Sequence, residues 1–264
     1  RNLYATPPTF HVPVDPETSR YARRNAPAGF GIGLLSFVKD STIIGLSDSE
    51  DWDEDGISGR VNFEQGEVGR FGYKSQAATL ESFNRGAMIN QMGITSDPLF
   101  YELTDMELMS HSPSWFEWFI QSALAQVSAP NEPTIDDDLA PDPEISNTEQ
   151  EDILVFSIYL GVPQPSEMDE TAVQGKELFA EIGCADCHIP TIDSSIGAIP
   201  AYSDLLLHDM GEELSDGLNI GFASATEFRT QPLWGVKMHG PFLHDGRADT
   251  LRESIEWHGG ESGN

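Results

Sequence analysis

Apolar residues return every three or four positions in several separate stretches of the chain, and long segments rich in glycine, proline or acidic residues lie between them. This spacing places the apolar side chains on one face of a helix, as in helices that pack on a core. It predicts a mainly α fold with long loops. The helices are expected near residues 33–39 and 76–90, directly after Ser112-Pro113, and near 153–160, 170–182 and 251–258.

Some of these helices carry signals for where they begin or end. Thr148 with Glu151, and Thr250 with Glu253, have the spacing of capping boxes, in which each side chain bonds the other residue's backbone N–H. Gly183 stands just past the helix near 170–182, where glycine tolerates the left-handed backbone that ends many helices. These signals predict the helix boundaries in the second half of the chain.

Two segments of different character divide the chain at residue 147. Residues 1–28 hold many prolines and arginines, which indicates an extended arm, and residues 128–147 are rich in proline and aspartate, as surface loops and linkers are. We predict an irregular, partly helical segment with an acidic loop over residues 1–147, packed on a second, helical domain over residues 148–264.

The charge of the chain is strongly one-sided, with 44 acidic residues against 14 basic ones and a formal net charge of -30. Nucleic-acid binding requires a basic surface and is excluded as a function. A field of one sign steers oppositely charged molecules, so a basic partner protein fits this composition; solubility in a saline habitat explains it equally well. No apolar run reaches the length of a transmembrane helix, and no membrane span is expected.

The only two cysteines of the chain lie in the sequence Cys184-Ala185-Asp186-Cys187-His188. This C-x-x-C-H spacing is typical of c-type haem attachment, in which both thiols form thioethers with the haem and the histidine becomes the proximal iron ligand. A zinc site without further cysteines would have to be of the Cys2His2 type. A thioredoxin-like redox motif would need a βαβ context, which the pattern does not show. We therefore interpret the motif as a covalent haem c site.

The residues before the motif fit this interpretation. Gly175-x-x-Leu178-Phe179 has the pattern of cytochrome c domains, in which the glycine lets a second helix cross closely and the two larger side chains face the haem. Residues 148–264 are therefore predicted to form a cytochrome c-type helical haem domain with long loops. Covalent haem is normally attached outside the cytoplasm, so we expect a periplasmic or secreted protein.

A second set of chemically active residues lies in an acidic stretch near residue 50. Asp51, Asp53, Asp55 and Gly56 match the first half of a calcium loop, in which alternating carboxylates supply oxygen ligands. The second half departs from that pattern, because Asn62 stands where an EF-hand has a bidentate glutamate. Ca²⁺ bound by the three aspartates is one interpretation, and an acidic turn whose side chains bond their own backbone is the other.

Several further motifs of the chain are shared with a known family. They are Asp55–Arg60, Gly69–Gly72, Met92–Thr95, Asp204–Gly211, Phe228–Gly235, Phe242–Ala248 and Glu256–Glu261. Together with the C-x-x-C-H motif they resemble the di-haem oxidoreductases, which include thiol oxidoreductases and peroxidases related to bacterial di-haem cytochrome c peroxidases and to MauG-type enzymes. The resemblance covers residues 24–264, which is most of the chain.

The resemblance implies a function in electron transfer. Proteins of that family carry two C-x-x-C-H motifs, and in the relatives one haem activates peroxide while the other delivers electrons; this chain has one such motif. We expect it to hold the electron-transfer haem of a di-haem peroxidase-like oxidoreductase, as the C-terminal part of a longer protein with a second haem domain before it. The alternatives are a mono-haem member of the family and a pure electron-transfer cytochrome without substrate chemistry.

The face of the iron opposite His188 needs its own ligand. The histidines and methionines that follow the motif are the candidates: His208, Met210, Met238, His239, His244 and His258. In the peroxidase relatives this ligand comes from the corresponding terminal helix as methionine or tyrosine, and the resemblance places His258 at that position. We predict His258 as the sixth ligand, with Met238 and Met210 next, since histidine and methionine are common axial ligands.

Three more residues are expected near the haem. Arg229 and Arg247 are among the few cations of the chain and suit the haem propionates, because arginine recognises carboxylates with two hydrogen bonds. Surface salt bridges are the alternative for both. Trp234 is expected to pack against the porphyrin. No catalytic residue is identified from the sequence.

Overall fold

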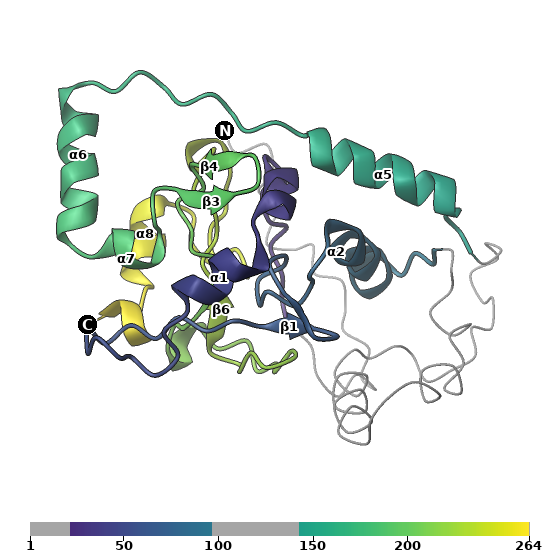
Figure 1. Ribbon diagram of the computed structural model, residues 1–264, viewed down its shortest axis with the longest axis horizontal. Helices are drawn as coiled ribbons and strands as arrows, with labels where there is room; N and C mark the ends of the chain where they lie inside the picture. The colour runs from purple at the N-terminus through teal and green to yellow at the C-terminus, as the bar shows by residue number, and fades with distance from the viewer. Residues whose placement is uncertain (1–21, 97–142, 264) are drawn as a thin grey trace.

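The structure is a computed structural model that describes residues 22–96 and 143–263 (Figure 1). Three of the predicted segments lie wholly or mainly outside these ranges: the arm over 1–28, the helix after Ser112-Pro113 and the linker over 128–147. Among the described helices, none combines the length and the apolar character that crossing a bilayer requires.

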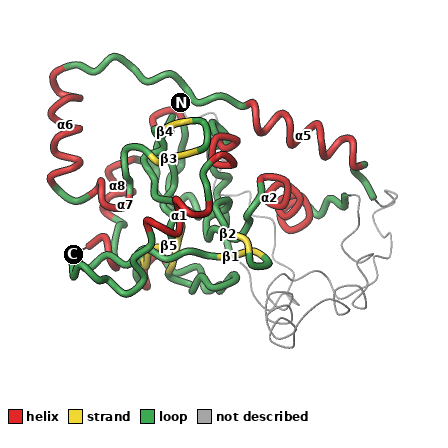
Figure 2. Tube along the Cα trace, viewed as in Figure 1, coloured by secondary structure: helices red, strands yellow, loops and turns green. Residues whose placement is uncertain are grey.

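The described helices are short to medium in length and lie around an irregular centre (Figure 2). The α-helices are α1 (Asp40–Leu46), α2 (Leu80–Ala87), α5 (Asn147–Tyr159), α6 (Glu170–Glu181), α7 (Cys184–Cys187) and α8 (Leu251–Glu256). A π-helical turn, η2 (Met88–Met92), continues α2. The 3-10 helices are η1 (Ile32–Phe37), η3 (Glu212–Leu214), η4 (Val236–Met238) and η5 (Gly260–Gly263).

The described strands form three separate antiparallel pairs. These are β1 (Phe63–Glu64) with β2 (Glu67–Val68), β3 (Ile192–Ser194) with β4 (Gly197–Ile199), and β5 (Leu207–Asp209) with β6 (Glu227–Arg229). In the last pair, Leu207 stands opposite Arg229 and Asp209 opposite Glu227. β5 also lies beside the turn that carries the cysteines, because the sulfur of Cys187 is 3.7 Å from Nδ1 of His208 on this strand.

The prediction of a mainly α fold is wrong. Helical residues make up 36% of the structure and strand residues 13%, and irregular loops account for the rest. The strands β3 to β6 all lie within residues 148–264, where a helical domain with long loops was expected. Strands of two or three residues are too short to produce an alternating pattern, so periodicity alone does not reveal them.

Two predicted helix starts have different outcomes. The capping box of α8 is confirmed, because the Thr250 side chain accepts from the Glu253 backbone and Glu253 bonds back to Thr250. The box predicted at Thr148 and Glu151 is wrong by two residues. Ser146 and Glu149 form it instead, and α5 therefore begins at Asn147.

One hydrophobic core joins the two halves of the described chain. Leu35, Ile43 and Phe71 belong to the same cluster as Ile192 and Leu205, and each of these side chains is 1% exposed or less. In Figure 1, α1 and the β3–β4 hairpin lie together at the centre of the molecule, and α1 contacts β3. The division into domains at residue 147 stays a prediction.

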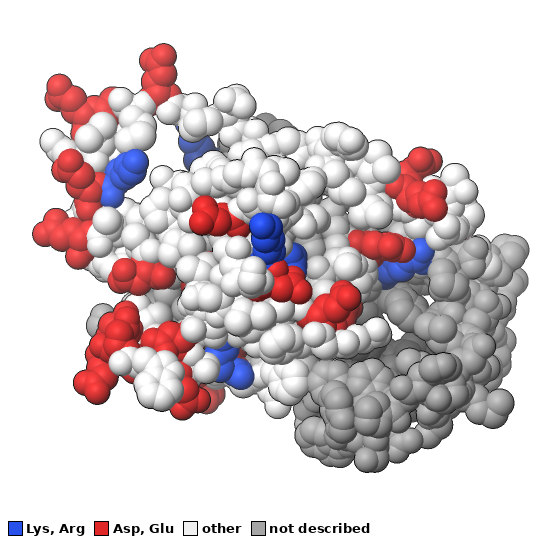
Figure 3. Space-filling model, in the orientation of Figure 1, with Lys and Arg blue, Asp and Glu red and all other residues white. Residues whose placement is uncertain are grey.

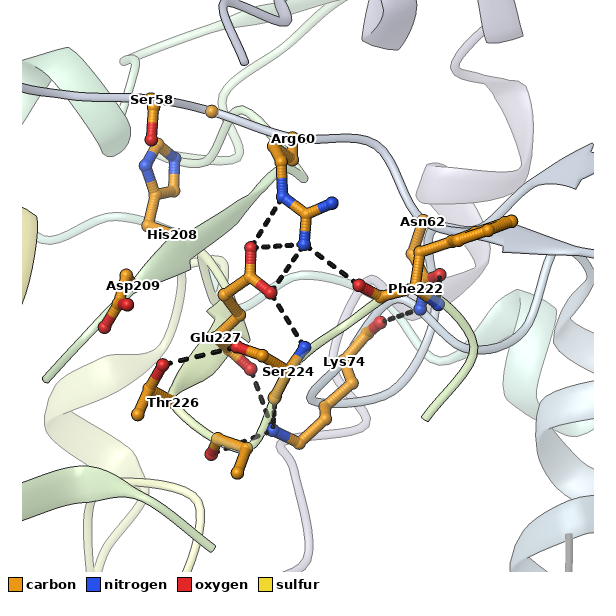
Figure 4. A network of polar contacts seen from close by, with 12 residues as sticks. Ser58, Arg60, Asn62, Lys74, His208, Asp209, Phe222, Ser224, Thr226 and Glu227 are labelled. Carbon is orange, nitrogen blue, oxygen red and sulfur yellow. Dashed lines mark hydrogen bonds and ion pairs between the residues drawn. The ribbon is translucent and has the colours of Figure 1, made fainter. Parts of the chain in front are cut away.

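A buried lysine also ties the two halves together (Figure 4). Lys74 is 1% exposed, and its Nζ donates to the carbonyls of Ser224, Ala225 and Glu227 at 2.7, 3.2 and 2.9 Å. The same Nζ lies 3.2 Å from the Asp216 carboxylate. Burial lowers the pKa of Lys74 to about 8. Carbonyl groups in a loop lack the hydrogen-bond donors that a neighbouring strand would supply. The Lys74 ammonium group donates these hydrogen bonds instead.

Neighbouring isoleucines of α1 provide a matched test of the core. Ile43 is 0% exposed and Ile44 is 51% exposed. Ile43→Ala is expected to lower the free energy of unfolding by about 2–4 kcal/mol, because it removes buried methyl groups and leaves a cavity. Ile44→Ala should stay within about 0.5 kcal/mol of the unmodified protein. Urea denaturation measures both, and equal losses for the two variants would contradict this placement of the core.

Candidate functional site

The cysteine motif forms a single helical turn between α6 and β3. Gly183 precedes it with a φ of 85°, a left-handed conformation that ends α6 and lets the chain turn directly into α7. Cys184 and Cys187 lie at the two ends of α7, are half-buried and are free thiols. Burial raises the pKa of the Cys184 thiol. The turn therefore presents two unbridged sulfur atoms, separated by one helical turn.

His188 follows the turn and is held in a fixed orientation. Its Nδ1 lies 2.8 Å from the Tyr202 carbonyl oxygen, which accepts the Nδ1–H, and its Nε2 makes no hydrogen bond within the described residues. Burial lowers the pKa of His188, so the ring is neutral at pH 7. A neutral imidazole with a free Nε2 and a bonded Nδ1 is the form in which histidine ligates a metal.

His258 has the same arrangement at the end of α8. Its Nδ1 lies 2.7 Å from the Ser254 carbonyl oxygen, and no hydrogen bond to its Nε2 occurs within the described chain. The charge of His258 contributes to the lowered pKa of His188, so the two rings lie within electrostatic reach of each other. In Figure 1, α6, α7 and α8 lie together on one side of the molecule.

Apolar side chains are exposed on the helices next to these histidines. On α6, Leu178 is 52% exposed, and Ile182, at the end of this helix, is 63% exposed. On α8, Leu251 is 42% and Ile255 is 68% exposed. Neither helix buries a single residue. Large exposed apolar surface is characteristic of a binding site, and these residues fit an apolar group such as a porphyrin.

The other candidates for the sixth iron ligand have different surroundings. His208 is buried with both ring nitrogens hydrogen-bonded. His244 is also buried, its ring stacks on Phe228 at 4.2 Å, and burial lowers its pKa to about 4. Met238 is 65% exposed beside the half-buried His239. The remaining candidate, Met210, is half-buried and follows β5.

Arg229 lies inside the protein without a carboxylate in direct contact among the described residues. Its guanidinium is 6% exposed and donates to the Arg70 carbonyl at 2.6 Å and to Gln231 at 2.7 Å, and its Nε has no partner. Burial lowers the pKa of Arg229 to about 10. An unpartnered buried donor is rare in folded proteins, so this side chain suits an additional acceptor.

Arg247 and Trp234 lie in different environments. Arg247 donates to the Asp245 carboxylate at 2.7 Å and to the Glu213 carbonyl at 2.6 Å, and its guanidinium lies 4.8 Å from the ring centre of Trp257. Trp234 belongs to the main hydrophobic core, where its ring closely approaches Gly31. The expectation that both contact the haem stays a prediction.

The acidic loop gathers carboxylates in a slightly different set from the predicted one. Asp48, Asp51 and Asp53 bring one oxygen each within 4.8 Å of one another. Asp55 is outside this group and accepts from the backbone N–H of Ile57. The sequence pattern missed Asp48, which lies three residues before the calcium-loop match and outside its spacing.

Two free thiols, a histidine with an unbonded Nε2 and helices with exposed apolar side chains lie together here, an arrangement that suits a haem. The family described as "Di-haem oxidoreductase, putative peroxidase" matches residues 16–264, and the chain belongs to that family. A search of curated proteins found no match. Family membership confirms the resemblance drawn from the motifs and makes haem the cofactor of this protein.

Sequence reasoning missed the groups that orient the two histidines. Tyr202 and Ser254 act through backbone carbonyls, which every residue carries, so no residue type marks them. It also missed the two carboxylates around His208, which come from Asp204 and Glu261. The spacing of Asp204 and His208 gives a weak signal for the first of these contacts.

A salt bridge lies on β6, the strand that pairs with β5 (Figure 4). Arg60 donates to both carboxylate oxygens of Glu227, at 2.7 Å from Nε and 2.5 Å from Nη2. Burial alone would raise the pKa of Glu227, but hydrogen bonds from Arg60 and Ser224 outweigh burial and lower it. The contact fastens β6 to the segment before β1.

The lowered pKa of Glu227 predicts a pH-dependent contribution to stability. A carboxylate with a depressed folded-state pKa stabilises the protein above its unfolded pKa of about 4.3, and this contribution is lost as the pH falls through the folded value. Glu227→Gln is expected to cost about 1–2 kcal/mol at pH 7. The difference from the unmodified protein should shrink below about pH 4.

Urea denaturation between pH 7 and pH 3 measures this difference. Glu67→Gln is the control, since Glu67 lies exposed on β2 and forms no ion pair within the described residues. A difference for Glu227→Gln that stays constant down to pH 3 would reject the ionic contribution.

Proposed function

We propose that this chain carries the electron-transfer haem of a di-haem peroxidase-like oxidoreductase. Cys184 and Cys187 hold the haem through thioethers, with His188 and His258 as the ligands on its two faces. The observation that carries the proposal is the shared geometry of the two histidines. In His188 the Nδ1–H donates to the Tyr202 carbonyl at 2.8 Å, and in His258 it donates to the Ser254 carbonyl at 2.7 Å. Nε2 of each ring makes no hydrogen bond within the described residues.

The hydrogen bonds at Nδ1 perform the same task for both ligands. They fix the tautomer, set the orientation of the ring and increase the basicity of Nε2. A haem iron bound by two histidines accepts and gives up single electrons, at a lower potential than one bound by histidine and methionine. Two protein ligands leave no open position for peroxide, so the reactive centre of the di-haem protein belongs to the second haem.

Arg229 is suited to donate hydrogen bonds to the propionates of the haem. The side chain is buried, has an unpartnered Nε and forms no ion pair with a carboxylate among the described residues. Arg229 and His188 are both influenced by the charge of Asp204, which indicates a common neighbourhood. Arg247 remains the second predicted partner, although Asp245 already occupies part of its guanidinium.

The redox partner of the proposed protein is expected to be basic, because a net charge of -30 attracts cations over long distances. Figure 3 shows acidic side chains in separate patches on the visible face, most of them toward its left edge, with fewer basic ones between them. A periplasmic or secreted location follows from covalent haem attachment. Ca²⁺ at Asp51, Asp53 and Asp55 also stays a prediction.

A pure electron-transfer cytochrome is the alternative function. A haem with both faces closed suits a carrier as well as it suits the relay haem of an enzyme. Peroxide turnover separates the two, because turnover by the full-length protein, with none by this chain alone, supports the peroxidase-like assignment.

Covalent attachment predicts a change in mass and spectrum that depends on the cysteines. The intact protein should carry the mass of one haem under denaturing conditions and give a pyridine haemochrome spectrum of the two-thioether type. Cys187→Ala should shift that spectrum to the one-thioether type, because a single thiol remains. A denatured protein without attached haem would contradict the assignment.

Axial ligation by His258 predicts a change of spin state. His258→Ala should convert a low-spin haem spectrum to a high-spin one, because the iron loses a strong-field ligand on one face. His239→Ala is the matched control and should leave the low-spin spectrum unchanged. An unchanged spectrum for His258→Ala would reject this ligand and favour Met238 or Met210.

A further inference from the structure

His208 forms the centre of a buried charged cluster beside the cysteine motif. Its Nε2 lies 2.8 Å from the Asp204 carboxylate and its Nδ1 lies 3.1 Å from the Glu261 carboxylate. The same Nδ1 is 3.7 Å from the sulfur of Cys187. His208 and Asp204 are 4% and 3% exposed. A buried cluster with such contacts is expected to have one defined geometry.

The cluster connects the segments on both sides of the proposed haem. The Asp204 backbone N–H donates to the Cys187 carbonyl at 3.1 Å, which ties β5 and the loop before it to the motif. Glu261 belongs to η5, three residues after His258, and accepts from the backbone and the hydroxyl of Ser58 at 3.0 and 2.7 Å. His208 therefore connects η5, which follows His258, with α7, which precedes His188.

The charge of this cluster follows from its hydrogen bonds. Burial alone would lower the pKa of His208, but the hydrogen bonds with Asp204, Cys187 and Glu261 raise it to about 12. The pKa of Glu261 is lowered by its bond with His208, although burial opposes this. The His208 ring is therefore an imidazolium at pH 7. Its positive charge lies next to the sulfur of Cys187, which forms a thioether with the haem in the proposed function.

We propose that His208 is a positioning residue that holds Cys187 and, through Glu261, the segment carrying His258, and that its positive charge raises the reduction potential of the haem. The inference rests on the proposed function. A nearby cation favours the reduced iron, because reduction removes one positive charge from the haem. The carboxylates of the cluster act in the opposite direction.

Two substitutions that remove charges of opposite sign test this inference. His208→Gln removes the cation while its amide still bonds one carboxylate. Glu261→Gln removes an anion and leaves the pair between His208 and Asp204 in place. The haem-loaded protein is titrated with redox dyes while its absorbance is followed, and the fraction of low-spin haem is measured in the same samples.

We expect His208→Gln to lower the reduction potential and Glu261→Gln to raise it, and His208→Gln to increase the high-spin fraction. His239→Gln is the control and should change neither quantity. Shifts in the same direction for both variants would show a structural effect alone and overturn the inference. Unchanged potentials in a haem-loaded protein would overturn it while the proposed function stands.

If His208→Gln does not fold, the potential of Glu261→Gln decides: a rise supports the inference, and an unchanged value overturns it. An unmodified protein without covalent haem would overturn the proposed function and this inference together.

Discussion

Buried cations that donate to backbone carbonyls hold this irregular fold together. Strands of two or three residues leave most loop carbonyls without a ladder partner, and a buried carbonyl without a partner is costly. Lys74 bonds three carbonyls near β6, Arg70 bonds those of Val38 and Val68, and Arg229 bonds that of Arg70. Segments from both ends of the chain are joined in this way, and the rest of the structure depends on these contacts.

The site takes its rigidity from this framework, because α7 itself is a single turn. Residues 202–206 link the site to the interior of the protein. Leu205 and Leu206 are buried in the core, and the Ser203 hydroxyl donates to the Thr230 carbonyl at 2.7 Å. From the same segment, the Ser203 and Asp204 N–H groups donate to the carbonyls of Ile189 and Cys187. His188 is therefore positioned by a loop anchored in the interior, and hydrogen bonds of this kind hold a metal-binding histidine in one orientation.

The sequence allowed the family to be predicted more fully than the fold. The C-x-x-C-H motif and its flanking motifs pointed to the family, and helix signals located α6 and α8, because capping and glycine termination act over a few residues. The strand pairs were missed, since pairing such as that of Leu207 with Arg229 depends on distant residues. The carbonyl partners of the histidines were missed because a backbone group has no residue-specific signature.

The inward cations also change how the surface charge should be understood. Arg70, Lys74, Arg85 and Arg229 are all 9% exposed or less, so part of the small basic complement never reaches the surface. The solvent-facing layer is therefore more uniformly anionic than a net charge of -30 suggests. Carboxylates in such a layer repel one another over roughly the Debye length, about 8 Å at physiological ionic strength. Dissolved salt screens this repulsion, so the ions around the protein contribute to the stability of its folded state.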